Sequence, residues 1–220
     1  GTYAHGIEID YTPTTTGKVT ISTESVSEFN DALDEANDVA VSGGTVSVEE
    51  ASAIQDISGY DAGDSYYSID DDSGTVISAG DSVLANGNIS VDVDNDVGAS
   101  DGAILNAFTA DIDFDVSDTA VNLAAQVNGT NGIAGSLDDA RTVTVESGTA
   151  IGAADAEAIQ AISGYSGAGS DYDITDNAAA LISAGDDVLN VAGVDIVTAS
   201  DTSVNANIGG DLAGFTADIE

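Results

Sequence analysis

The chain has 220 residues, enough for one domain with a sizeable core or for two small ones, and its 42% hydrophobic content argues against wholesale disorder. Forty Asp and Glu residues against two Lys and Arg residues give a formal net charge of −38, which excludes a nucleic-acid binder. The lack of Cys and the single histidine, His5, remove disulfides, thiolate metal sites and most enzyme chemistry. No apolar run reaches the length of about 18 residues that a membrane span needs, so we expect no membrane insertion.

Residues 1–16 are predicted to form an N-terminal strand and a linker that do not follow the rest of the chain. The run Ile7–Tyr11 alternates apolar and polar residues, as a strand does, and Pro13 lies in a threonine-rich stretch typical of an extended linker. We expect this strand to be an interface element that can complete the sheet of a neighbouring molecule.

Short strand-like runs with alternating apolar residues then recur along the chain. The predicted strands are 19–22, 45–48, 66–70, 89–94, 111–116, 142–146, 171–175, 194–198 and 217–220. Helix-like stretches lie between them and carry apolar residues at helical spacing. The clearest of these apolar sets are Val26, Phe29, Leu33 and Ala36; Val121, Ala124 and Val127; and Ile208, Leu212 and Phe215.

The chain also contains a large internal repeat. Residues 54–84 align without a gap on residues 159–189, with 17 of 31 positions identical at an offset of 105, and residues 108–112 recur as 215–219. One strand and one short helix cannot bury their apolar faces alone, so neighbouring units must stack. We therefore predict an α/β solenoid of short strand–helix repeats with one parallel sheet, with an all-β parallel solenoid or sandwich as the alternative. Its two expected parts are residues 17–113 and, continuous with them, residues 114–220.

Polar triplets precede several of the predicted helices. They are Ser117-Asp118-Thr119, Thr175-Asp176-Asn177 and Ser200-Asp201-Thr202, each followed by an alanine-rich run. Side-chain oxygens at such positions accept the free N–H groups of the first helical turn, so we expect helix caps here.

The repeated sequence motif resembles that of a known class of proteins. Residues 116–125 read Val-Ser-Asp-Thr-Ala-Val-Asn-Leu-Ala-Ala, and residues 174–182 read Ile-Thr-Asp-Asn-Ala-Ala-Ala-Leu-Ile. This is similar to the Asp-Thr-Ala-Ala-x-Leu repeats of large secreted bacterial surface proteins, the S-layer-like and adhesin-like chains that are often associated with calcium. The resemblance implies an extracellular or cell-surface structural role and carries over no catalytic residue.

Strand alternation decides where the carboxylates lie. In residues 111–116 the apolar side chains should face the helices, which leaves the aspartates on the other side of the sheet. Stacked strands then place carboxylates about 5 Å apart, where each pair repels by roughly 1 kcal/mol in water. Two basic residues cannot neutralise such a face. Ca²⁺ can, because it accepts irregular shells of carboxylate ligands. The alternative is an acidic surface that binds no specific cation and is screened by salt alone.

We therefore expect several calcium sites on the chain. The sequence Asp92-x-Asp94-x-Asp96 opens like an EF-hand loop, but Val97 stands where that loop needs Gly, so it is not one. The candidate ligands are Asp70, Asp71, Asp72, Asp92, Asp94, Asp96, Asp111, Asp113, Asp115, Asp118, Asp171, Asp173, Asp176 and Asp201.

These observations predict a structural subunit or repeat segment of an extracellular filament, S-layer or adhesin. It would assemble head to tail with copies of itself and be stabilised by divalent cations. The alternative is a monomeric surface module that binds polysaccharide or another cell-surface ligand. We expect no enzyme, because the protease-like motif Asp72-Ser73-Gly74-Thr75 has no partner aspartate in the second repeat, where Asn177 replaces Asp72.

Overall fold

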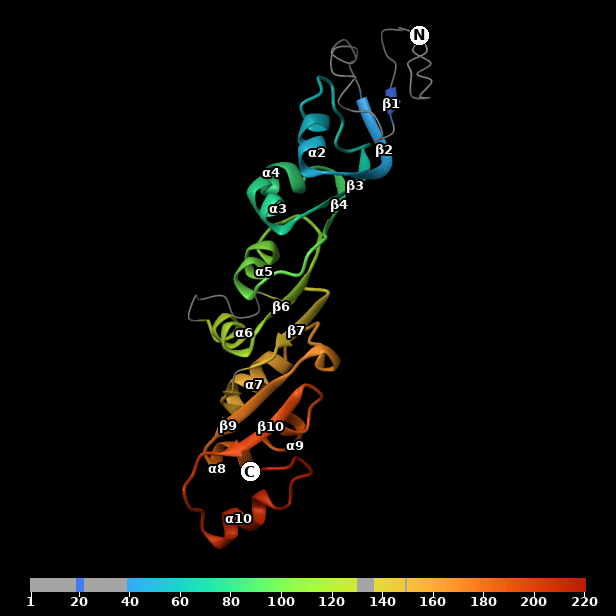
Figure 1. The fold of residues 1–220 in the computed structure, drawn as a ribbon. Helices are drawn as coiled ribbons and strands as arrows, with labels where there is room; N and C mark the ends of the chain where they lie inside the picture. The colour runs from blue at the N-terminus through green and yellow to red at the C-terminus, as the bar shows by residue number, and fades with distance from the viewer. Residues whose placement is uncertain (1–18, 22–38, 130–136, 149) are drawn as a thin grey trace. The chain divides into compact units, whose positions relative to one another are not determined.

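The computed structural model describes residues 19–21, 39–129, 137–148 and 150–220 (Figure 1). Strands and helices alternate along this part of the chain, and every strand pairing in it is parallel, so the predicted α/β class is confirmed. The helices exclude the all-β alternative. The predicted strand at Ile7–Tyr11, the linker around Pro13 and the helix around Phe29 lie outside the described residues.

The described residues form two compact units. The first contains residues up to Asp94 together with Phe108–Asp113, and the second contains Asn95–Ala107 together with Phe114–Glu220. None of the described helices is long and apolar enough to cross a membrane.

The first unit is built on one five-stranded parallel sheet in the order β1-β2-β3-β4-β5. Its strands are β1 (Val19–Ile21), β2 (Val39–Val46), β3 (Tyr66–Asp71), β4 (Asn88–Val93) and β5 (Ile112–Asp113), and its helices are α2 (Val48–Gln55), α3 (Ser73–Ala79) and α4 (Asp81–Leu84). Ile69, Val91 and Ile112 are register partners on β3, β4 and β5, and all three are buried. Stacked apolar residues on consecutive strands therefore make the core of this unit.

The second unit has two parallel sheets, β6-β7 and β10-β9-β8. Its strands are β6 (Asp115–Thr119), β7 (Thr142–Glu146), β8 (Ala150–Ile151), β9 (Tyr172–Asp176) and β10 (Val194–Ala199). Its helices are α5 (Ala99–Asn106), α6 (Ala120–Val127), α7 (Ala153–Gln160), the 3-10 turn Gly167–Gly169, α8 (Ala178–Ala184), α9 (Asp186–Leu189) and α10 (Ala206–Leu212). Phe114, Leu123, Ile159 and Tyr172 are fully buried in its core.

Several predicted boundaries are wrong. The strand predicted at 45–48 ends at Val46, because Ser47 caps α2 in a capping box with Glu50. The strand predicted at 111–116 is two strands, separated at Phe114, and residues 217–220 form only an isolated bridge between Ile219 and Val197. The pairings also form separate parallel sheets rather than the single sheet that we predicted.

The predicted alternation of buried and exposed residues is confirmed. Val91 and Val93 are buried while Asp92 and Asp94 are exposed, and along residues 111–116 Asp111 and Asp113 are exposed, Asp115 is half-buried and the apolar residues are buried. The predicted helix face is only partly right, because in α6 the buried residues include Leu123 and Ala124 while Val121 is 49% exposed.

Candidate functional site

A row of carboxylates crosses the sheet of the first unit. Asp70, Asp92 and Asp113 are direct register partners on β3, β4 and β5, and all three side chains are exposed. We call these three residues the aspartate ladder. Neighbouring strands lie about 4.8 Å apart, so each aspartate has a like charge close to it. On the same strands, the hydroxyl groups of Ser68 and Ser90 share a hydrogen bond of 2.9 Å.

The ladder is a line of carboxylates and not a cluster. Among residues 19–21, 39–129, 137–148 and 150–220 there is no group of three or more His, Cys, Asp or Glu side chains arranged to hold a metal ion. Carboxylate oxygens are the ligands that hard cations prefer, and the ladder presents them in pairs along its length.

A second group of predicted ligands hydrogen-bonds to the start of a helix. A side-chain oxygen of each aspartate accepts the N–H of the first helical residue about 20 residues before it in the chain. These bonds join Asp71 to Val48 at 3.0 Å, Asp118 to Ala99 at 2.9 Å, Asp176 to Ala153 at 3.1 Å and Asp201 to Ala178 at 2.6 Å. We call these four residues the linking aspartates, because each one ties a strand end to the start of an earlier helix.

The helix caps that we predicted are present, but the capping residue is the neighbour of the aspartate. Thr119 caps α6 and Asn177 caps α8, each accepting a backbone N–H from its own helix. Asp118 and Asp176 instead serve the preceding helices, α5 and α7. The prediction for the third triplet is wrong, since Asn205, not a residue of Ser200-Asp201-Thr202, caps α10.

The other predicted ligands lie apart from one another. Asp72 caps α3 and accepts two hydrogen bonds from Thr75, and Asp173 accepts the N–H of Ile196 at 3.2 Å. Asp115 pairs with Arg141 at 2.6 Å and also accepts the hydroxyl of Thr142. The remaining four side chains are exposed: Asp94, Asp96, Asp111 and Asp171.

Among the residues that the structure describes, three carboxyl groups have lowered pKa values. The hydrogen bond from the Thr75 side chain lowers the pKa of Asp72, and the hydrogen bond from Arg141 lowers the pKa of Asp115. For Asp186, desolvation raises the pKa, but hydrogen bonds from Thr216 and Ala217 outweigh it and the pKa is lowered. All three are held ionised by local donors.

A partly buried glutamine–tyrosine link recurs in both units. The Gln55 side chain donates to the Tyr67 hydroxyl at 3.0 Å and to the Val83 carbonyl at 2.8 Å. Gln160 makes the same two bonds, to Tyr172 at 2.7 Å and to the Val188 carbonyl at 3.0 Å. Burial raises the pKa of both tyrosines well above the ordinary value. The repeated Ile-Gln pair at 54–55 and 159–160 was visible in the sequence, but its role was not.

Asp81 and Asp186 hold a second recurring link. Asp81 accepts the N–H of Thr109 at 2.9 Å in the first unit, and Asp186 accepts the N–H of Thr216 at 3.0 Å in the second. In each unit this bond fixes the backbone at the threonine of the repeated sequence Phe-Thr-Ala-Asp-Ile.

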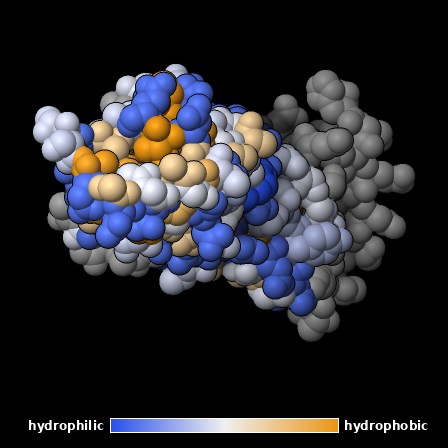
Figure 2. All heavy atoms as spheres, turned by 90° about the horizontal axis from the view of Figure 1, so that it is seen from below, coloured by the Kyte–Doolittle hydropathy of each residue, from blue (hydrophilic) through white to orange (hydrophobic). Residues whose placement is uncertain are grey.

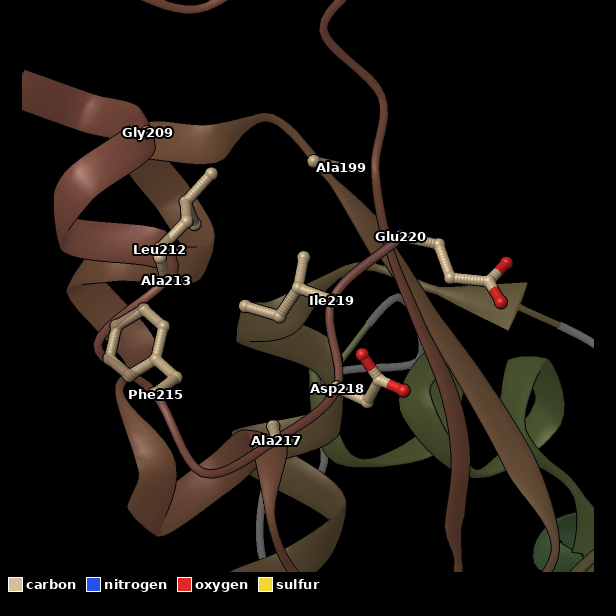
Figure 3. A pocket seen from close by; sticks show the side chains of 9 residues that line it. All are labelled: Ala199, Gly209, Leu212, Ala213, Phe215, Ala217, Asp218, Ile219 and Glu220. Carbon is tan, nitrogen blue, oxygen red and sulfur yellow. The ribbon is translucent and has the colours of Figure 1, made fainter. Parts of the chain in front are cut away.

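The last segment of the chain borders a pocket of about 350 Å³ beside α10 (Figure 3). Leu212, Phe215 and Ile219 line it, and Figure 3 shows Ile219 directed toward α10 while Asp218 and Glu220 point to the other side. Residues 217–220 bond on one side to β10, through Ala199 N–H to the Glu220 carbonyl at 2.8 Å and Glu220 N–H to the Val197 carbonyl at 2.9 Å. Figure 2, seen from below, shows apolar surface framed by hydrophilic side chains.

Comparisons of the chain with known protein families, with curated proteins and with solved structures find no match. The arrangement of the described residues is therefore the basis for a functional proposal.

Proposed function

We propose that this protein is a structural solenoid, a subunit or repeat segment of an extracellular filament, S-layer or adhesin. The observation that carries the proposal is the recurrence of the same internal contacts at an offset of 105 residues. The linking aspartates Asp71 and Asp176, and the glutamine links of Gln55 and Gln160, occupy equivalent places in the two units. A polar framework repeated in this way supports stacking of further units in the same manner.

The edge strands of the described residues support head-to-tail assembly with copies of the same chain. In the first unit β1 is the outer strand of the five-stranded sheet, and in the second unit residues 217–220 follow β10 at the edge of the β10-β9-β8 sheet. An edge strand presents backbone N–H and C=O groups to another chain. All pairings in the described residues are parallel, so the two edges are of compatible polarity.

The aspartate ladder supports stabilisation by Ca²⁺. Each of its two register pairs, Asp70 with Asp92 and Asp92 with Asp113, brings two carboxylates to adjacent strands. A divalent cation that bridges a pair replaces the repulsion by attraction and completes its shell with water. We propose such pairwise bridging in place of a cage built from many aspartates.

A surface binding module is the second candidate function, and Tyr66 favours it. Its side chain is 57% exposed, and it shares the parity of Ser68 and Asp70 on β3. An exposed ring beside hydroxyl and carboxylate groups suits stacking against a sugar of a cell-surface polysaccharide. For both candidates we propose an extracellular location and no catalytic activity.

Thermal unfolding and negative-stain imaging of the same samples test the proposal. The protein is compared in millimolar Ca²⁺, in excess chelator and in NaCl of matched ionic strength, because a ligand of the native state must raise its stability. A Ca²⁺-specific rise together with fibres or sheets supports the structural function. Equal protection by NaCl with no assemblies contradicts it and favours the binding module.

A further inference from the structure

Two asparagines in the described part of the chain are followed by glycine. Asn86-Gly87 lies in the turn between α4 and β4, and Asn128-Gly129 lies at the end of α6; a third pair, Asn131-Gly132, lies outside the described residues. An asparagine before glycine can lose its side-chain amide without an enzyme, because no side chain on the glycine hinders attack by its backbone nitrogen. Any difference in reactivity between the two described pairs must come from the fold.

In the second unit, hydrogen bonds hold both groups that would react. The Asn128 side-chain amide donates a hydrogen bond to the Asp155 carboxylate at 2.6 Å, which ties the end of α6 to the first turn of α7. The Gly129 N–H donates to the Gln126 carbonyl at 3.3 Å. Both bonds must break before the Gly129 nitrogen can attack the Asn128 side chain, so both raise the barrier to the reaction.

The corresponding groups of Asn86 and Gly87 in the first unit have a different environment. Among the residues that the structure describes, no hydrogen bond joins the Asn86 side chain or the Gly87 N–H to another group. Gly87 is exposed and Asn86 is half-buried, whereas Asn128 is exposed. Access to water alone would therefore make Asn128 the more reactive asparagine, and hydrogen bonding predicts the opposite order.

We infer that Asn86 is a site of spontaneous conversion to aspartate and isoaspartate, and that this conversion weakens the sheet of the first unit. The deprotonated Gly87 nitrogen attacks Cγ of Asn86 and forms a C–N bond. The Cγ–Nδ2 bond then breaks, and the amide nitrogen takes up a proton and leaves as ammonia. Water hydrolyses the resulting cyclic imide, either at Cγ to give aspartate or at the backbone carbon to give isoaspartate. The inference does not depend on the proposed function, which concerns assembly.

The turn at Gly87 is closely packed at the start of β4. Gly87 has a φ of 92°, and a Cβ at this position would overlap the Ala62 carbonyl oxygen. The next side chain, Asn88, donates a hydrogen bond to the Gly63 carbonyl at 3.2 Å. An isoaspartate at position 86 adds a carbon atom to the main chain directly before these contacts, and it therefore displaces the start of β4 from its place beside β3.

Peptide mapping of the full chain by mass spectrometry tests the inference. The protein is incubated in mildly alkaline buffer, both folded and in concentrated urea, and the conversion of each asparagine is followed with time. Each rate in the folded protein is divided by the rate in urea, which removes the effect of the local sequence. This ratio should be at least about tenfold higher for Asn86 than for Asn128, because only Asn128 must first break two hydrogen bonds. An equal or lower ratio for Asn86 overturns the inference.

Asp155→Ala is the matched variant for the cause of the selectivity, because it removes the acceptor of the Asn128 amide. It should speed the conversion of Asn128 severalfold and leave the rate at Asn86 unchanged. An unchanged rate at Asn128 overturns hydrogen bonding as the cause.

Asn86→Ala tests the effect on stability. In the second unit Ala192 stands before Gly193, which has a φ of 99° and directly precedes β10, as Gly87 precedes β4. After incubation the parent should have a lower melting temperature than a fresh sample, and Asn86→Ala, incubated in parallel, should lose less. Equal losses overturn the proposed weakening of the sheet. Should Asn86→Ala fail to fold, Asn86→Gln replaces it in the same comparison.

Discussion

The Asp176 carboxylate accepts the backbone N–H of Ala153, the first residue of α7, at 3.1 Å. Asp71 makes the equivalent bond to Val48 in the first unit at 3.0 Å. The first N–H groups of a helix have no partner inside it, so a carboxylate from the next strand both satisfies one of them and complements the helix dipole. The bond thereby couples the order of one helix to the position of the following strand.

Asp176→Ala should lower the free energy of unfolding by about 1 kcal/mol, the usual effect of losing a helix cap. Asp171→Ala is the control, since it removes the same charge from an exposed neighbouring position and should change stability by less than about 0.5 kcal/mol. Urea unfolding of both variants gives the comparison. Equal effects would mean that the carboxylate acts only through its charge.

Gln160→Leu should cost about 1–3 kcal/mol, because it leaves the Tyr172 hydroxyl and the Val188 carbonyl without their hydrogen-bond donor. Adding Tyr172→Phe to that variant should cost less than Tyr172→Phe alone in the parent. A double-mutant cycle by urea unfolding measures this coupling. Additive effects of the two substitutions would show that the link contributes no energy of its own.

The sequence predicted those features that depend on alternation along a strand. The parity of Val91 and Asp92 follows from the two-residue period, and it placed the aspartates on the exposed face correctly. The Ser47-x-x-Glu50 capping box was readable but was missed, which misplaced the end of β2.

Features that join distant parts of the chain could not be predicted from the sequence. The bond from Asp118 to Ala99 depends on which helix lies beside a strand end, and local sequence signals only a cap. The break at Phe114 likewise depends on pairing partners, since β5 pairs with β4 whereas β6 pairs with β7. Strand pairing is a tertiary property that the alternation pattern does not encode.

Stability should fall as the pH rises above about 10, the ordinary pKa of tyrosine. Burial raises the pKa of Tyr67 and Tyr172, so the unfolded chain loses these protons at a lower pH than the folded one does. Their stabilising contribution is fully present below the unfolded pKa and is lost above it. Urea unfolding at several alkaline pH values, with Tyr172→Phe as the comparison, measures the slope; a slope unchanged in that variant would contradict the assignment.

Asp92→Ser should stabilise the protein in chelator at low salt, because it removes the central charge of the aspartate ladder. Each pair at this spacing repels by roughly 1 kcal/mol in water, and serine already occupies the position two residues before Asp92 on β4, at Ser90. The same variant should lose most of the stabilisation by Ca²⁺. Thermal unfolding in Ca²⁺ and in chelator measures both expected changes in stability. If Ca²⁺ stabilises the variant as much as the parent, the cation binds elsewhere.

Gly102→Leu should destabilise the fold by at least about 1–3 kcal/mol, since the new side chain overlaps Val116 and Leu137. Gly209→Leu at the equivalent position should cause no loss in the monomer. Chemical unfolding at low protein concentration compares them. Similar losses would show that the two positions are packed alike.

Sedimentation velocity of the full chain over a range of protein concentrations in Ca²⁺ tests the structural function most directly. The proposed head-to-tail assembly predicts species larger than the 21.8 kDa monomer that grow with concentration and disperse in chelator. A single 21.8 kDa species at every concentration, with and without Ca²⁺, would contradict it.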